Sequence, residues 1–230
     1  MRDWFEAIVV SNRPAADGLV HLDLDVGDHP LRGAFERPGQ YVKLALEGVG
    51  EGPFAIASAP DPDSRVFEFL LKGGSALADA LGALPEGSLV RMGTVQGKGF
   101  PLEPARGKRV LLFATGSGIS AVRSLIEVIR RERSAYRDVT LYFGVRSPDA
   151  FAYEEELEDW ERSRIHLRRT VSQPGLSGWQ GLTGYVQQHV PKGPLEETVA
   201  YLCGQAEMVS GVTEVLVANG VPRESIFVNV

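Results

Sequence analysis

Short runs of alternating hydrophobic and polar residues mark the first hundred positions of the chain. Glycine, proline and aspartate separate these runs, as in Arg37-Pro38-Gly39. Several short strands at such spacing are typical of an antiparallel barrel or sandwich. One helical stretch, from Ser75 to about Leu84, interrupts them, with Ser75 in the N-cap position. The expected strands are Trp4–Val10, Val20–Asp25, Tyr41–Leu46, Phe54–Ser58, Val66–Leu71 and Ser88–Met92.

The pattern then changes to an alternation of strands and helices. A segment with two prolines and a glycine, Pro101–Lys108, precedes the change and is the expected hinge. Alternation of this kind predicts a parallel sheet covered by helices. We therefore expect an antiparallel Greek-key β-barrel over residues 1–104 and a Rossmann-like α/β domain over residues 105–230. The strands expected in the second domain are Arg109–Ala114, Val139–Val145, Ile165–Val171, Val199–Cys203 and Ser225–Val228, and the helices are Ile119–Arg133, Ala152–Arg162, Gly184–His189 and Ala206–Ala218.

One strand–turn–helix unit carries the clearest chemical signal. The apolar run Arg109–Ala114 ends in the turn Thr115-Gly116-Ser117-Gly118, and a helical pattern begins at Ile119. Such a turn directs backbone N–H groups and the positive end of a helix dipole at one point, which suits a phosphate. Its glycines allow ligand and backbone to approach closely. The spacing is not the full G-x-G-x-x-G, so this motif alone leaves a nucleotide site and a turn without ligand equally open.

Composition and charge narrow the possible functions. The chain has 230 residues and a net charge of −6, and residues 1–105 carry 9 basic against 15 acidic residues. An acidic first half argues against nucleic acid as a partner, and no apolar run is long enough to span a bilayer. Cys203 is the only cysteine, which excludes a disulfide or a cysteine-ligated cluster within the chain. The four histidines show no ligand spacing, so no metal is expected, and the absence of a signal peptide pattern favours a cytoplasmic location.

Seven short motifs, in order along nearly the whole chain, resemble the ferredoxin–NADP reductase superfamily. They are Pro38-Gly39-Gln40-Tyr41, Phe54-Ala55-Ile56-Ala57-Ser58-Ala59-Pro60, Lys72-Gly73-Gly74-Ser75, Gly97-Lys98-Gly99-Phe100, Ala114-Thr115-Gly116-Ser117-Gly118-Ile119, Thr183-Gly184-Tyr185-Val186 and Cys203-Gly204-Gln205-Ala206-Glu207-Met208. The chain is most similar to a plant and bacterial subgroup of stand-alone FAD/NAD(P)-binding proteins. The resemblance implies FAD in the barrel and NADP or NAD in the second domain.

The resemblance places the flavin against two elements of the barrel. The first is the segment made of Phe54, Ala55, Ile56, Ala57 and Ser58. Phe54 stands for the family's tyrosine on the flavin ring, and Ala55 stands in the catalytic position of its serine, without the hydroxyl. Gly52 replaces the arginine that contacts the diphosphate. The second element is a glycine turn that leads into a helix and contains Lys72, Gly74, Ser75 and Ala76. Both elements are equally compatible with an ordinary barrel strand and a helix cap.

In the second domain the resemblance assigns three groups of residues to the pyridine dinucleotide. The turn formed by Thr115, Gly116, Ser117, Gly118 and Ile119 would bind its diphosphate. Arg146 and Tyr153 would bind the adenosine end, and arginine suits a 2′-phosphate because its fork is charged and bidentate. However, Gln173 and Tyr185 stand where NADP-specific relatives add basic residues. The third group is Cys203, Gly204, Gln205 and Met208, in which Cys203 would lie near the nicotinamide as a second catalytic position, unless it is a core residue.

These residues together predict an FAD-dependent NAD(P)H oxidoreductase. Hydride would pass from NAD(P)H to FAD, and electrons would leave to an external acceptor such as a small iron–sulfur protein, a cytochrome or a small molecule. The losses at Gly52 and Ala55 leave an alternative open, a catalytically weak nucleotide-sensing or partner-binding subunit of a larger redox assembly. A third hypothesis, an electron-transfer subunit of a partner dehydrogenase, is disfavoured because Cys203 is the single cysteine.

Overall fold

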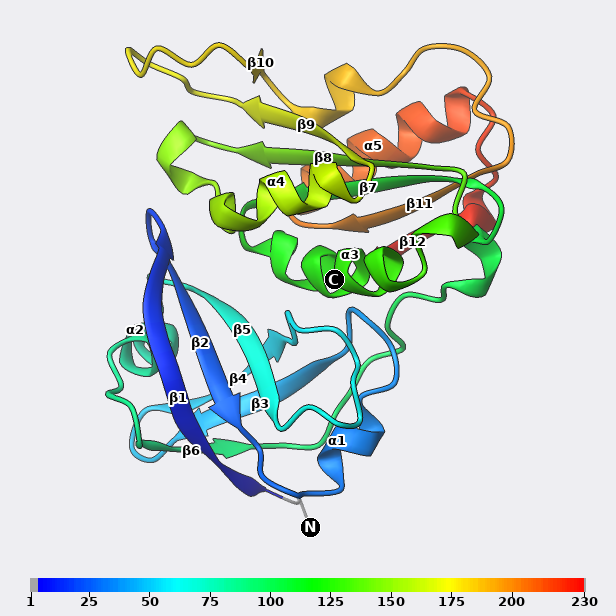
Figure 1. Cartoon of the computed structure of the whole chain (residues 1–230). Coiled ribbons are helices and arrows are strands. Elements are labelled where there is room, and N and C mark those ends of the chain that lie inside the picture. The colour runs from blue at the N-terminus through cyan, green and yellow to red at the C-terminus, as the bar shows by residue number, and fades with distance from the viewer. Residues whose placement is uncertain (1–3, 230) are drawn as a thin grey trace.

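Two six-stranded sheets build the protein in a computed structural model that describes residues 4–229 (Figure 1). The first sheet is antiparallel and has the strand order β4-β3-β6-β1-β2-β5. Two short helices, α1 (Leu31–Ala34) and α2 (Ala76–Gly82), accompany it. Its strands are β1 (Phe5–Ala16), β2 (Leu19–Asp25), β3 (Tyr41–Leu46), β4 (Gly50–Ala55), β5 (Val66–Lys72) and β6 (Leu89–Met92).

A bridge between Ile56 and Phe69 closes the first sheet into a barrel. It joins the residue that follows β4, at one edge of the sheet, to β5 at the other edge. Side chains alternate across each strand, so every second residue fills the interior. Fully buried residues of this interior include Leu22, Leu24, Val42, Leu44 and Val90. The prediction of an antiparallel β-barrel is confirmed.

The second sheet is parallel and has the strand order β10-β9-β8-β7-β11-β12. Helices α3 (Ile119–Arg131) and α4 (Glu154–Arg162) pack on one face, and α5 (Ala206–Ala218) packs on the other. This confirms the predicted α/β arrangement. No helix within residues 4–229 is both long enough and apolar enough to cross a membrane. The strands are β7 (Arg109–Thr115), β8 (Asp138–Val145), β9 (Ile165–Val171), β10 (Leu182–Thr183), β11 (Thr198–Cys203) and β12 (Ile226–Asn229).

Several element boundaries differ from the sequence-based expectations. The helix expected over Gly184–His189 is a single 3-10 turn, Val186–His189. One turn is sufficient there because it buries both Val186 and Val190 against the α5 side of the sheet, and Pro191 then disfavours a longer helix. Strand β4 begins four residues earlier than expected, while α1 and β10 were not expected at all.

The segment expected to be a hinge is anchored to the second sheet. Phe100 is 1% exposed, and its ring meets Tyr201 edge-on, with the centroids 5.3 Å apart. The Tyr201 hydroxyl donates a hydrogen bond to the Pro101 carbonyl at 2.6 Å, and the Gly107 N–H donates to the Ala135 carbonyl at 2.7 Å. The segment 101–108 is therefore held against the α/β half, and its expected role as a hinge stays a prediction. The domain boundary at residues 104 and 105 stays a prediction.

Candidate active site

Two neighbouring strands of the parallel sheet, β7 and β11, end side by side where the strand order reverses. Thr115 ends β7 and Cys203 ends β11. The two strand ends are in direct contact, because a Cβ atom on Gly118 would collide with the Cys203 carbonyl. The Gln205 N–H also donates to Thr115 Oγ1 at 3.2 Å. Ligands of open α/β sheets bind at this reversal point, and the structure brings the predicted turns 115–118 and 203–205 together there.

The N-terminus of α3 is prepared for an anion. It has no side-chain cap and no acidic residue in its first turn. Helices α4 and α5, by contrast, carry acidic residues at their starts, Glu154 to Glu156 and Glu207. Gly116 has a φ of 53°, and a side chain there would meet open space. Backbone N–H groups and the helix dipole therefore face a position that no protein carboxylate of this turn neutralises.

Cys203 lies at the reversal point as a neutral thiol. Burial raises its pKa to about 11, so the thiolate is not populated near neutral pH. A neutral thiol is a small, polarizable group that packs well against an aromatic ring. Gly204 adjoins it with a φ of 154°, and a Cβ atom there would meet Met208 Cε at 2.8 Å. The turn is therefore built for close packing.

On the barrel side, Phe54 and Ala55 end strand β4 and are half-buried. They pair with Val42 and Tyr41 of β3. Ala55 packs against the hydrophobic core of the α/β half, which places the end of β4 at the junction of the two sheets. Phe54 packs against the barrel core instead, so Ala55 is the residue of this pair that lies at the junction.

The next three residues, 56 to 58, use several of their backbone groups for hydrogen bonds within the protein. The Ile56 N–H donates to the Gln40 carbonyl at 3.0 Å, and the Ala57 N–H donates to the Glu68 carbonyl at 2.7 Å. The carbonyls of Ala57 and Ser58 accept hydrogen bonds from side chains of α3. These four backbone groups are therefore used within the protein, and contact of the flavin with the rest of the 56–58 segment stays a prediction.

The second flavin element, Lys72–Ala76, is exposed at the start of α2. Ser75 is the N-cap, and its Oγ accepts a hydrogen bond from the Ala78 N–H at 3.2 Å. The Gly74 N–H, expected to face the flavin diphosphate, instead donates to Asp79 Oδ1 at 2.9 Å. Sequence reasoning missed Asp79, although an acidic residue in the first turn of a helix is a recognisable signal.

The position of the absent arginine is covered by an apolar side chain. A Cβ atom on Gly52 would lie 3.2 Å from Leu77 Cδ2. Lys72 is the exposed cation of the second flavin element. Its charge and the Asp79 carboxylate oppose each other at this end of the barrel. The residues therefore fit a flavin ring better than they fit the flavin diphosphate.

Of the two residues expected to bind adenosine, Arg146 is exposed and Tyr153 is buried. Arg146 is exposed directly after β8, and its Nε donates to Gln173 Oε1 at 2.8 Å. Tyr153 is 1% exposed, and its ring lies 5.6 Å from the His21 ring, between the two sheets. Burial raises the pKa of its hydroxyl, which has no hydrogen-bond partner. Tyr153 cannot reach a bound adenosine, and this prediction is corrected.

Ile119 and Met208 are likewise core residues rather than ligand contacts. Ile119 is fully buried, and its N–H bonds back to the Gly116 and Ser117 carbonyls. Met208 is 4% exposed and lies beneath Gly204. Both residues hold the two turns from below, so their expected direct contact with cofactor is corrected.

A cluster of ionisable residues that the sequence did not indicate lies between the sheets. His21 Nε2 is 2.9 Å from Asp23 Oδ1 and 3.2 Å from Glu68 Oε2, and neither contact is aligned as a hydrogen bond. These three atoms lie close enough together to suggest a cation site. Arg13 Nη2, however, is 3.3 Å from His21 Nδ1. The positive charge of the Arg13 guanidinium beside this cluster opposes the binding of a metal ion there.

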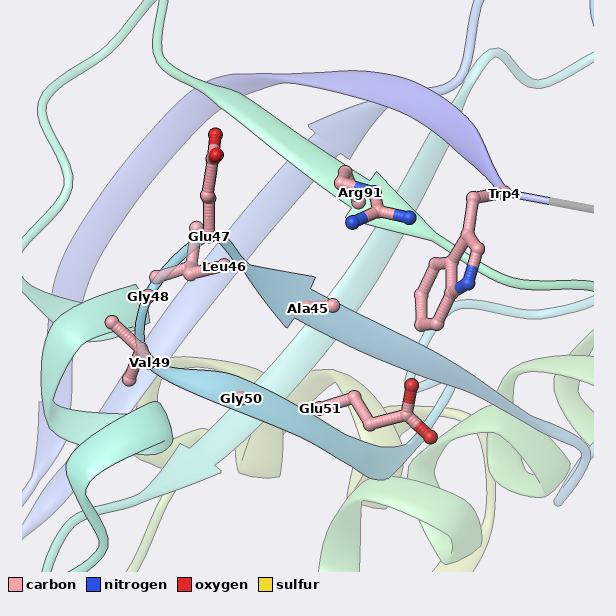
Figure 2. Close-up of a pocket in the computed structure, with 9 residues that line it drawn as sticks. All are labelled: Trp4, Ala45, Leu46, Glu47, Gly48, Val49, Gly50, Glu51 and Arg91. Atoms are coloured by element: carbon pink, nitrogen blue, oxygen red, sulfur yellow. The ribbon is translucent and has the colours of Figure 1, made fainter. Parts of the chain in front are cut away.

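Figure 2 shows a separate surface pocket of about 370 Å³ at the β3–β4 hairpin. Trp4 and Arg91 form one side, where the guanidinium carbon lies 5.0 Å from the indole centroid. Glu51, on the opposite side, has its Oε1 2.8 Å from Lys43 Nζ. None of the predicted site residues lines this pocket.

Comparisons with known proteins agree with this geometry. Residues 112–214 match the family model described as an oxidoreductase NAD-binding domain. The chain is 35% identical to "Fruit protein pKIWI502" of Actinidia deliciosa over 93% of this chain and 73% of that protein. It is 32% identical to "Ferredoxin--NADP reductase B" of Sorangium cellulosum (strain So ce56) over 97% and 96%. The solved structure titled "Ferredoxin reductase in carbazole 1,9a-dioxygenase" superimposes with a TM-score of 0.83 at 24% identity, over 99% of this chain and 69% of that one.

A barrel joined to a parallel nucleotide-binding sheet defines the class of two-domain reductases. The chain belongs to the ferredoxin–NADP reductase superfamily, which confirms the family resemblance of its motifs.

Proposed function

We propose that the protein is a flavin-dependent oxidoreductase that passes hydride from NAD(P)H to FAD and electrons on to an external acceptor. The observation that carries this proposal is the uncapped N-terminus of α3 at the strand reversal, beside the junction where Phe54 and Ala55 end β4. Membership of the reductase superfamily supports the same assignment. FAD, when bound, supplies the two-electron and one-electron chemistry, since it accepts hydride and releases single electrons.

The residues of the chain bind and orient the two cofactors. The N–H groups around Ser117 and Gly118 hold the diphosphate of the dinucleotide. Gly204 has no side chain, so a flat ring can approach the backbone beside Cys203 closely. On the barrel side Phe54 is the aromatic residue proposed to pack on the flavin ring, while the Ala55 side chain donates no proton or hydrogen bond. Lys72 is the cation of the flavin diphosphate site, and Asp79 weakens its effect.

For the nucleotide we propose NADP ahead of NAD, on the basis of one residue. Arg146 is exposed after β8, and its Nε is held by Gln173. That hydrogen bond leaves both terminal nitrogens of the guanidinium for a 2′-phosphate. The acceptor of the electrons is proposed to be an iron–sulfur protein, a cytochrome or a small molecule. The domain limits 1–104 and 105–230 and the cytoplasmic location stay predictions.

A second candidate function has its own support. Asp79 occupies the Gly74 N–H, and Leu77 covers Gly52, so the flavin diphosphate loses two expected contacts. A chain that binds the dinucleotide but holds flavin weakly would serve as a nucleotide-sensing or partner-binding subunit.

One experiment separates these functions. The protein is incubated with FAD, freed of excess ligand and titrated with NADPH in the absence of oxygen, while the visible spectrum is recorded. We expect a flavin spectrum that bleaches on reduction. A protein that binds NADPH, measured by calorimetry, but neither retains nor reduces FAD would contradict the oxidoreductase and favour the sensing subunit.

A further inference from the structure

A guanidinium is buried on the helix that begins at the dinucleotide turn. Arg123 of α3 is 9% exposed and stands among the fully buried Val122, Leu125 and Ile126. A buried charge without partners would destabilise the fold strongly. The partners of Arg123 therefore define what this residue accomplishes.

These partners come from both halves of the protein. From α4, Glu156 forms a bidentate pair, with Nε to Oε2 and Nη2 to Oε1 both at 2.8 Å. From the barrel, Nη1 meets Glu68 Oε2 at 2.9 Å and donates to the Ala57 carbonyl at 3.0 Å. The guanidinium carbon also lies 4.9 Å from the Tyr153 ring centroid. Through these contacts the Arg123 guanidinium joins α3 and α4 to the barrel.

The next residue along α3 makes a parallel contact. Ser124 Oγ donates to the Ser58 carbonyl at 2.6 Å. Two consecutive residues of the helix therefore hold two consecutive carbonyls of the barrel segment that continues from Phe54 and Ala55. Figure 1 shows α3 as the helix of the α/β half that faces the barrel.

This contact lies close to both candidate ligand positions. Extended chain advances about 3.3 Å per residue, so Ala55 is about 7 Å from Ala57 along the segment. A helix rises about 1.5 Å per residue, so Gly118 is about 7.5 Å from Arg123 along the axis. The Arg123 contact therefore lies two residues from Ala55 and less than two helical turns from the dinucleotide turn.

We propose that Arg123 is a positioning residue that fixes the dinucleotide turn of α3 against the flavin segment 54–58, and so sets the separation of the two cofactors. The proposal rests on the proposed function for its consequence, the hydride transfer rate. A misplacement of about 1 Å in a reacting pair can lower a rate by about 10²-fold. Arg123 touches neither reacting atom and acts only through the backbone that it holds.

The shape of the arginine side chain is essential to this role. Lysine keeps the charge but offers a single ammonium, which cannot serve Glu156, Glu68 and the Ala57 carbonyl together. Arg123→Lys therefore tests positioning while it keeps the positive charge next to Glu156 and Glu68. Glu68→Gln is the second variant, because it leaves the bidentate pair with Glu156 and removes the Glu68 charge, which faces both Arg123 and His21.

Arg130→Lys is the matched control. Arg130 lies two turns further along α3 and bonds to Glu127 of α3 and to Ser163 beyond the end of α4, so its contacts stay within the α/β half. Anaerobic stopped-flow reduction of the FAD-loaded proteins by NADPH gives the rate constant at saturation and the NADPH concentration for half-maximal rate. The long-wavelength absorbance of the nicotinamide–flavin complex reports the proximity of the two rings. Hydrogen exchange of the 54–58 peptide, measured without cofactor, reports the contact itself.

We expect Arg123→Lys to lower the saturating rate constant by ten- to a hundredfold, to leave the half-saturating NADPH concentration within about threefold, and to speed exchange in 54–58. Glu68→Gln should show a smaller change in the same direction, and Arg130→Lys should show none. A variant that loses rate only in proportion to weaker NADPH binding, or that keeps the wild-type rate and absorbance, overturns the proposal. If wild type itself is not reduced, the proposed function fails, and unchanged exchange in Arg123→Lys then separately rejects the contact.

Discussion

Replacing Asp79 by asparagine should tighten FAD binding while it weakens the fold. Asp79 Oδ1 accepts the Gly74 N–H at 2.9 Å, so a diphosphate at this turn would lie next to the carboxylate. Two unit charges 4 Å apart in water interact by about 1 kcal/mol, which corresponds to about a fivefold change in affinity. Because Asp79 is exposed, screening at about 0.1 M salt reduces this gain. We expect Asp79→Asn to bind FAD about two- to fivefold more tightly at low salt.

The same change has an opposite effect on stability. A carboxylate in the first turn of a helix contributes about 0.3–1 kcal/mol through the helix dipole, and the neutral amide loses that term. Fluorescence titration with FAD at two salt concentrations, together with urea unfolding, measures both effects. Glu86→Gln removes an equal charge from another exposed barrel loop and serves as the control. Equal tightening in both variants, or a gain that does not shrink with salt, would refute a local contact between Asp79 and the diphosphate.

Three further predictions address the nucleotide, the flavin ring and pH. Arg146→Ala should weaken NADPH by about tenfold more than NADH in calorimetric titrations, and equal losses would show that Arg146 does not read the 2′-phosphate. Ala55→Ser should speed flavin reduction if the new hydroxyl hydrogen-bonds to the flavin ring. If the ring lies elsewhere, the buried hydroxyl stays unsatisfied and destabilises the fold by about 1–3 kcal/mol, so the variant would melt at a lower temperature and be reduced no faster. Burial alone would lower the pKa of His21, but its contacts with the Asp23 and Glu68 carboxylates outweigh burial and raise it above 6.5. This contribution is present below pH 6.5 and is lost as the pH rises through the raised value. Urea unfolding should therefore show the stability of wild type falling relative to His21→Gln as the pH rises above 6.5, and parallel curves would contradict this prediction.

Local patterns in the sequence predicted the fold well because each element depends mainly on its own residues. The apolar run Arg109–Ala114, the glycine turn and the helix from Ile119 follow from spacing alone, and the structure has all three. The turn at 203–205 reaches the same place because parallel strands must end at one edge of their sheet.

The failures concern contacts between distant parts of the chain. Tyr153 follows a strand as an adenosine contact should, but its left-handed φ of 63° and the neighbouring barrel bury it against His21. In the sequence, Arg123 is a single charged residue within a helical pattern. Nothing near it in the sequence predicts that Glu68 and the Ala57 carbonyl are its partners. Pairings of this kind depend on how two sheets meet, which hydrophobic periodicity does not encode.

The anchored segment between the sheets has a consequence for protein engineering. Phe100 belongs to the barrel by sequence, yet its ring is buried against Tyr201 of the α/β half. A chimera that exchanges nucleotide-binding halves between relatives at residue 104 would pair Phe100 with a foreign surface. The chimera should instead be joined before Gly97, so that Phe100, Pro101 and Tyr201 all come from the same parent protein. For the same reason, the two halves should unfold as one cooperative unit, with a single calorimetric transition.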